Sequence, residues 1–193
     1  MGPTELHVVS TTVIWSTWVA WLAYWAWSSR HVNRTVDRQS WTSRLTLVGA
    51  LLVGVFVLPA ILGERVDALV FSPSVWSAAM GSGLCLSGLA LSIWARRTLG
   101  RNWSAMVTLK ERHELVRSGP YRYVRHPIYT CVLTMGLGTC LLSGRVRAFM
   151  VLAMVLLAFL VKMRREERLL ESHFGGAYIE YRKSVRALVP FVA

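Results

Sequence analysis

Long apolar runs separated by polar segments make up most of the chain. The five runs cover residues 6–27, 45–62, 75–94, 127–142 and 148–161. As a helix, the first run would be about 33 Å long, which is enough to cross the hydrocarbon core of a bilayer. The last two runs are shorter and are joined by a Ser-Gly-Arg turn signal. We expect flanking residues to extend both into a helical hairpin.

This pattern predicts an all-α polytopic membrane helical bundle with about five transmembrane helices. No shift in composition divides the chain, so we expect a single domain, residues 1–193. Three amino-terminal spans would occupy residues 1–94, and residues 95–193 would hold a long polar loop, the hairpin and a carboxy-terminal helix. Leucines and aromatic residues recur at three- and four-residue steps after residue 166, which indicates an amphipathic helix there. Gly175 and Gly176 are expected to bend it.

Small residues mark the places where these helices are expected to approach closely. Ser77, Gly81 and Cys85 recur every four residues in the third run, the pattern that lets membrane helices pack tightly. Gly136 and Gly138 are expected to do the same in the hairpin. The three cysteines all lie inside apolar runs, so the sequence indicates neither a disulfide framework nor a metal site.

Composition supports the membrane interpretation, since 54% of the residues are hydrophobic and nine are tryptophan. The net charge of +12 would suggest nucleic acid for a soluble chain. With the amino terminus outside, however, the inside segments 28–44, 95–126 and 162–193 hold 19 of the 22 Lys and Arg residues and seven of the ten acids. The positive-inside bias then explains the whole excess, and no nucleic-acid partner is required. It also places the carboxy terminus in the cytoplasm.

Two polar segments stand out on the predicted cytoplasmic side. Residues 119–129 read GPYRYVRHPIY, and residues 164–170 read RREERLL, one hairpin further on. Each segment also has an explanation that involves no functional site. The arginines in the first segment can anchor a helix at the membrane surface. The glutamates in the second can pair with neighbouring cations on a solvated helix face.

The run HELVRSGPYRYVRHPIY, an apolar hairpin and then EERLLESHFGGAYIEYRKSVRALVPF together resemble the isoprenylcysteine carboxyl methyltransferase-like family. This family, with the related phospholipid methyltransferases, comprises integral-membrane enzymes that use S-adenosylmethionine and release S-adenosylhomocysteine. The resemblance covers roughly residues 99–191. It implies a cytoplasm-facing methyltransferase that draws a lipophilic acceptor from the bilayer, such as an isoprenylcysteine-type carboxylate, a related lipid or a small molecule.

The chemistry of the cofactor agrees with the residues in the two motifs. S-adenosylmethionine carries a carboxylate, which Arg, His or backbone N–H groups bind best. Its ammonium group and ribose hydroxyls need acidic acceptors. The purine needs an aromatic or apolar slot, and tyrosine faces favour the sulfonium. The resemblance assigns cofactor binding to Leu115, Val116, Tyr121, Arg125, His126, Pro127, Tyr129, Glu166 and Glu167.

The acceptor side has fewer signals. Methyl transfer is a direct in-line displacement, which requires alignment and a deprotonated, desolvated nucleophile. Arg165 and Arg182 are the cations expected to position an anionic acceptor, and Asn102 and Trp103 are candidates for lining its entrance. Tyr178 and Tyr181 are interpreted as packing residues.

Two other functions remain open on sequence alone. The first is an NADPH-dependent membrane enzyme like the sterol reductases, some of which share a related carboxy-terminal helical arrangement. The second is a non-enzymatic membrane scaffold whose basic face recruits anionic lipid.

Overall fold

The computed structural model describes residues 3–30, 35–38, 49, 53, 60–61, 63–100, 108–110 and 115–190. The second predicted span, residues 45–62, therefore lies almost entirely outside the described part of the chain. Four long helices dominate that part, and they are α1 (Pro3–Ser28), α4 (Val75–Leu99), α5 (Pro127–Ser143) and α6 (Val146–Phe174). A shorter helix, α7 (Gly176–Ser184), follows α6.

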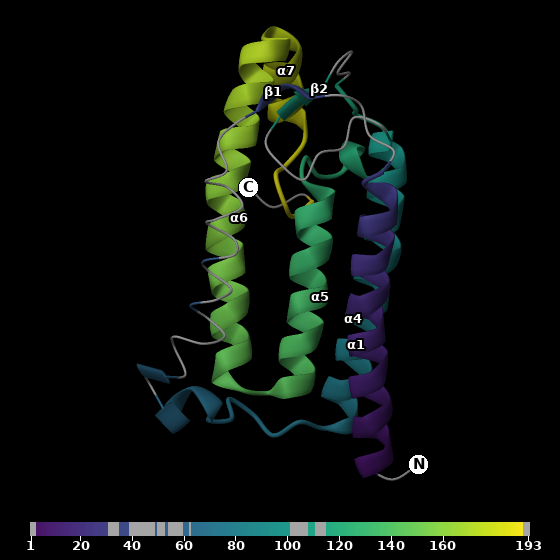
Figure 1. Cartoon of the computed structure of the whole chain (residues 1–193), viewed down its shortest axis with the longest axis vertical. Coiled ribbons are helices and arrows are strands. Elements are labelled where there is room, and N and C mark those ends of the chain that lie inside the picture. Colours follow the sequence, from purple (N-terminus) through teal and green to yellow (C-terminus); the bar gives the residue numbers. More distant parts are fainter. Residues whose placement is uncertain are drawn as a thin grey trace.

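The helices form an upright bundle (Figure 1). Helices α1 and α4 run side by side, α5 packs on α4, and α6 stands beyond α5. One end carries α7 and the short 3-10 helix η4 (Gly119–Arg122). The opposite end carries the amino terminus, the α5–α6 turn and a second 3-10 helix, η2 (Gly63–Asp67).

The predicted helical bundle is confirmed, with one departure from the all-α expectation. Strands β1 (Thr35–Arg38) and β2 (Thr108–Lys110) pair antiparallel at the same end as α7. They come from two polar loops far apart in sequence, so their pairing depends on tertiary proximity rather than on any local periodicity. By length and composition, α4 and α6 could each cross a membrane, and α5 is a shorter apolar helix. The number of spans stays a prediction.

Glycine allows α4 and α5 to come into backbone contact. A Cβ atom added to Gly81 would lie 2.6 Å from the carbonyl oxygen of Gly138, so the two helices could not approach this closely with larger residues. Cys85 is fully buried at the same interface and its thiol lies 3.2 Å from the carbonyl of Met135. The prediction of close packing is thus confirmed for Gly81 and Cys85. Ser77 instead caps the start of α4.

The predicted hairpin is confirmed and has a glycine turn. Gly144 ends α5 with φ 62°, a left-handed conformation that favours glycine, and an added Cβ would clash with the carbonyl oxygen of Phe71. A Cβ on Gly136 would lie 2.8 Å from Leu152 of α6, so this glycine serves the hairpin contact, whereas Gly138 serves α4.

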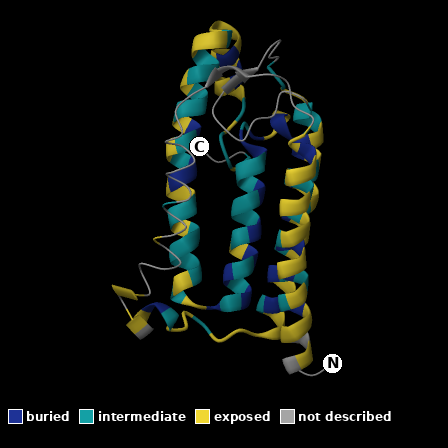
Figure 2. Ribbon diagram, viewed as in Figure 1, coloured by how far each residue is buried: buried dark blue, intermediate teal, exposed yellow. Residues whose placement is uncertain are grey.

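Apolar side chains cover much of the outer surface. Figure 2 shows exposed residues along the outer side of α1, where Trp15 is 62% exposed. Trp76 on α4 and Leu157 on α6 are also exposed. The buried centre lies between α1, α4 and α5 and includes Ile14 and Met135. Large apolar residues facing outward along several helices are typical of a lipid-facing surface.

The unequal lengths of α5 and α6 bring the two polar motifs together. Helix α5 has 17 residues and α6 has 29, so α6 is longer by about 18 Å. Because the two helices are antiparallel neighbours, the extra turns of α6 extend past the start of α5. The segment 164–170 therefore reaches the level of the residues that precede Pro127.

Candidate active site

The first motif enters the site through a constrained turn. Gly119 has φ 58°, and an added Cβ would lie 2.7 Å from the Thr98 hydroxyl at the end of α4. The next residues form η4, and Pro127 then begins α5, where its fixed φ suits the first helical turn. Only glycine combines this backbone conformation with so close an approach to α4.

The carboxy-terminal segment holds the same motif from the other side. The backbone N–H of Arg125 donates to the carbonyl of Arg186 at 2.8 Å, and that of His126 donates to the carbonyl of Ala187 at 3.0 Å. These bonds satisfy two donors that would otherwise be left unpaired next to the helix start. The peptide geometry of the Arg-His pair is therefore set by a segment about sixty residues away in sequence.

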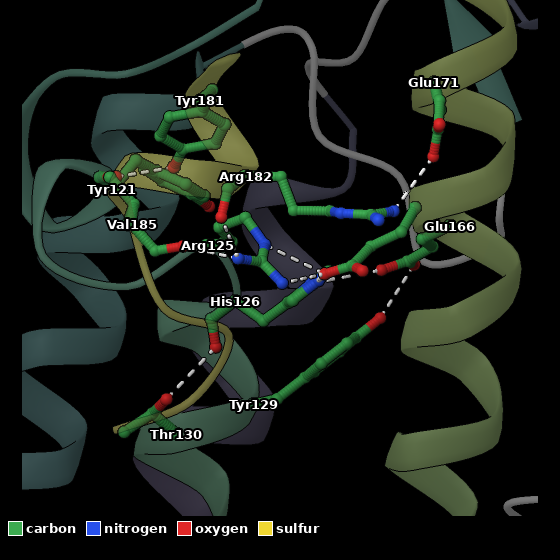
Figure 3. A network of polar contacts seen from close by, with 11 residues as sticks. Tyr121, Arg125, His126, Tyr129, Thr130, Glu166, Glu171, Tyr181, Arg182 and Val185 are labelled. Atoms are coloured by element: carbon green, nitrogen blue, oxygen red, sulfur yellow. Dashed lines mark hydrogen bonds and ion pairs between the residues drawn. The ribbon is translucent and has the colours of Figure 1, made fainter. Parts of the chain in front are cut away.

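Arg125 connects the two halves of the site (Figure 3). Its Nε and Nη2 atoms lie 2.9 Å and 2.8 Å from Oε1 of Glu167. Its Nη1 donates to the carbonyls of Arg182, at 3.1 Å, and Val185. One planar guanidinium thus binds α6, the end of α7 and the segment after it.

His126 is 8% exposed and contacts both adjacent glutamates. Its Nε2 lies 3.1 Å from Oε1 of Glu167, and its Nδ1 lies 3.6 Å from Oε2 of Glu166. Tyr129 donates its hydroxyl to Oε1 of Glu166 at 2.7 Å (Figure 3). Both glutamates thus contact residues of the first motif, as the sequence suggested. Glu166 also pairs with a neighbouring cation on its own helix, since Lys162 lies 3.9 Å from it.

Planar side chains stack beside this network. The Tyr129 ring lies between His126, with centroids 5.4 Å apart, and Phe159 of α6, with centroids 4.5 Å apart. Both pairs are stacked, and the Lys162 ammonium lies 5.2 Å from the centroid of the tyrosine ring. Stacking fixes the ring planes and so helps to hold the histidine in one orientation.

A small pocket of about 70 Å³, partly open to solvent, lies beside the network. Five of the residues assigned to cofactor binding line it: Leu115, Val116, Tyr121, Arg125 and His126. Four further lining residues were missed as site residues: Leu99, Leu170, Tyr178 and Tyr181. Leu170, Phe174, Tyr178 and Tyr181 follow one another at four- and three-residue steps. This spacing is a visible signal, but it does not distinguish packing against a helix from lining a pocket.

The two tyrosines of α7 differ in their hydrogen bonding. Tyr181 donates its hydroxyl to the carbonyl of Tyr121 at 2.5 Å, and burial raises the pKa of Tyr181 to about 12. Arg117 lies over the Tyr181 ring and donates to the carbonyl of Ala177. Tyr178 is 1% exposed, and its hydroxyl has no hydrogen-bond partner within the described residues.

The other predicted site residues lie around this pocket or outside the described chain. Pro127 is buried at the start of α5, and Tyr129, Glu166 and Glu167 belong to the adjacent network. Arg182 is exposed and pairs with Glu171 at 3.0 Å. The pocket-lining set contains neither Arg182 nor Arg165, the partly buried residue next to Glu166. Asn102 and Trp103 lie outside the described residues.

Comparisons with known proteins place the chain among related proteins. The isoprenylcysteine carboxyl methyltransferase (ICMT) family matches residues 81–172. Protein-S-isoprenylcysteine O-methyltransferase B of Arabidopsis thaliana is 30% identical over 159 residues, covering 78% of this chain and 81% of the relative. The cobalt-zinc-cadmium resistance protein CzcN of Cupriavidus metallidurans is 35% identical over 126 residues, covering 64% of this chain and 57% of that protein.

A solved structure shares the fold. The eukaryotic intramembrane Ras methyltransferase ICMT superposes with a TM-score of 0.52 and 24% identity, covering 81% of this chain. This chain spans 55% of the solved one, so the likeness concerns the shared helical part. From the sequence relatives and this shared fold together, the chain belongs to the isoprenylcysteine carboxyl methyltransferase family of integral-membrane methyltransferases.

Proposed function

We propose that the protein transfers the methyl group of S-adenosylmethionine to a lipophilic acceptor at the end of the bundle that carries α7 and η4. The observation that carries this proposal is the network in which Arg125 and His126 both contact Glu167 beside the pocket. It joins two motifs that are about forty residues apart in sequence. A site of this kind needs mixed polar groups beside an apolar pocket, and both are present.

The residues present fit the cofactor. Leu115, Val116 and Tyr121 would form the apolar and aromatic wall for the purine. The contacts of Glu167 with Arg125 and His126 all use Oε1, so within the described residues Oε2 is available to an ammonium or ribose hydroxyl. When bound, S-adenosylmethionine supplies a methyl carbon activated by the attached sulfonium.

Arg125 and His126 would act in two ways. Both line the pocket, so each can face the carboxylate of the cofactor. At the same time, both hold Glu167 in place, since charge-assisted hydrogen bonds are strong and directional. Arg125 already uses three nitrogens for protein contacts, so holding Glu167 and the backbone of residues 182–185 is its larger contribution.

The acceptor is proposed to be lipophilic and to arrive from the bilayer. Several relatives are named as methyltransferases of protein-S-isoprenylcysteine, which favours a prenylated carboxylate, whereas CzcN is named for metal resistance. Arg165 and Arg182 are the cations proposed to position such an anion. The charge distribution supports a cytoplasmic site, with the amino terminus outside and the carboxy terminus inside.

Calorimetric titration of the detergent-purified chain with S-adenosylhomocysteine tests this proposal. We expect wild-type protein to bind, and we expect Glu167→Gln and His126→Ala to weaken binding by about tenfold or more, because each removes a charge-assisted contact at the pocket. Glu180→Gln is the matched control, since Glu180 is an exposed carboxylate on α7. Folded wild-type protein that does not bind, or variants that bind like the wild type, would contradict the proposal.

A further inference from the structure

Tyr178 combines three properties that packing alone does not explain. Its side chain lines the pocket, it is 1% exposed, and its hydroxyl has no hydrogen-bond partner within the described residues. Tyr181, one helical turn later and also lining the pocket, satisfies its hydroxyl with the carbonyl of Tyr121 at 2.5 Å. Two tyrosines on one face of α7 therefore differ in whether the hydroxyl has a hydrogen-bond partner.

A buried hydroxyl without a partner is costly to a folded protein. It loses its hydrogen bonds to water and gains none in return, so native structures seldom keep such groups without a reason. A phenylalanine would fill the same space without this cost. Burial, with the nearby Glu167 carboxylate, raises the pKa of Tyr178, so the hydroxyl remains protonated and able to donate at neutral pH.

The surroundings hold Tyr178 in place before any ligand arrives. Tyr181 anchors α7 to η4 through Tyr121, and Arg117 donates to the carbonyl of Ala177, the residue before Tyr178. The rings of Tyr178 and Tyr181 also meet edge to face, with centroids 6.1 Å apart. These contacts fix α7 both before and after Tyr178, so the Tyr178 hydroxyl is preorganised. Little conformational entropy then remains to be lost when a ligand binds.

We propose that the Tyr178 hydroxyl is a binding donor for the S-adenosyl cofactor in this pocket. The assignment rests on the proposed function and adds a residue to its binding set. It replaces the interpretation of Tyr178 as a packing residue, which its helical spacing suggested. Tyr178 is here a residue that determines affinity, and it takes no part in moving a proton.

Tyr178→Phe and Tyr181→Phe form a matched pair for testing this assignment. Each removes one hydroxyl from the same helix. In the unliganded full chain, we expect Tyr178→Phe to leave the melting temperature unchanged or to raise it, because no internal hydrogen bond is lost. Tyr181→Phe should lower the melting temperature, because it breaks the bond to Tyr121. In titrations with S-adenosylhomocysteine, Tyr178→Phe should weaken binding by roughly threefold to tenfold.

The outcomes separate this inference from the proposed function. If wild-type protein binds S-adenosylhomocysteine and Tyr178→Phe binds it equally well, the Tyr178 assignment fails while the proposed function stands. If folded wild-type protein does not bind, both fail. A lower melting temperature of unliganded Tyr178→Phe would also overturn the assignment, because the hydroxyl would then have a partner inside the protein.

Discussion

At the scale of single residues, Arg125 does more than its place in a basic motif suggests. An arginine near a helix start can simply be exposed at the end of the bundle, as Arg122 is. Arg125 instead contacts Glu167 and two backbone carbonyls. The same residue type at a spacing of three therefore has two different environments, and only the contacts distinguish them.

Arg125→Lys should destabilise the protein by about 1–3 kcal/mol, because an ammonium cannot reproduce the planar fork that reaches Glu167 and the carbonyls together. The midpoint of thermal unfolding in detergent would measure the change. Arg122→Lys is the control and should leave the midpoint unchanged. If both variants unfold like the wild type, Arg125 is only a surface cation, as a lipid-recruiting scaffold would require.

At the scale of elements, the contact between α4 and α5 sets the position of the site. Helix α4 ends beside η4, and α5 begins directly after His126. A shift of one helix along the other would move the Arg-His pair away from the glutamates of α6. The backbone contact between Gly81 and Gly138, in the half of the bundle farther from the site, therefore helps to fix this position.

Gly81→Ala should destabilise the bundle by about 1–3 kcal/mol, because its Cβ would lie 2.6 Å from a backbone oxygen that cannot move aside easily. Gly83→Ala, two residues further along α4, is the matched control, since its Cβ would meet nothing within 4 Å. The control should be neutral or slightly stabilising, because alanine favours helix. Thermal unfolding of the two variants provides the comparison, and equal midpoints would show that the helices are not held at this contact.

At the scale of the whole molecule, charge and architecture agree. The end of the bundle that carries the candidate site includes α7 and the polar end of α6, and the opposite end carries η2 and the hairpin turn. The sequence assigns these ends to opposite sides of the membrane because basic residues concentrate at the first. The fold places both motifs at one end, as that assignment requires.

Labelling with a membrane-impermeant maleimide tests the orientation. Lys183→Cys, at the exposed end of α7, should react only from the cytoplasmic side, and Arg65→Cys, in the exposed part of η2, only from the outside. The background should be low, because Cys85, Cys131 and Cys140 are all buried. Intact cells and inverted vesicles provide the two sides, and the reverse labelling pattern would mean that the amino terminus faces the cytoplasm.

Much of the fold could be predicted from local signals, and about half of the pocket from a family resemblance. The apolar runs predicted α1, α4, α5 and α6, because helix length and hydropathy are properties of contiguous segments. Five residues that the family resemblance assigned to the cofactor line the pocket. The strand pair β1–β2 had no such signal, since each strand is short and its partner lies far away in the chain.

The sequence by itself therefore determined helices α1, α4, α5 and α6, and it indicated that the two motifs lie at one end of the bundle. Only the tertiary structure decided which groups contact one another: Glu167 with Arg125 and His126, and Tyr181, but not Tyr178, with an internal acceptor. The physical reason is that a hydrogen bond forms only when the distance between donor and acceptor is correct to within a few tenths of an ångström, and here the two groups come from segments far apart in the chain. Those distances follow from the register of α5 against α6 and from the path of the chain after α7, which no local pattern records.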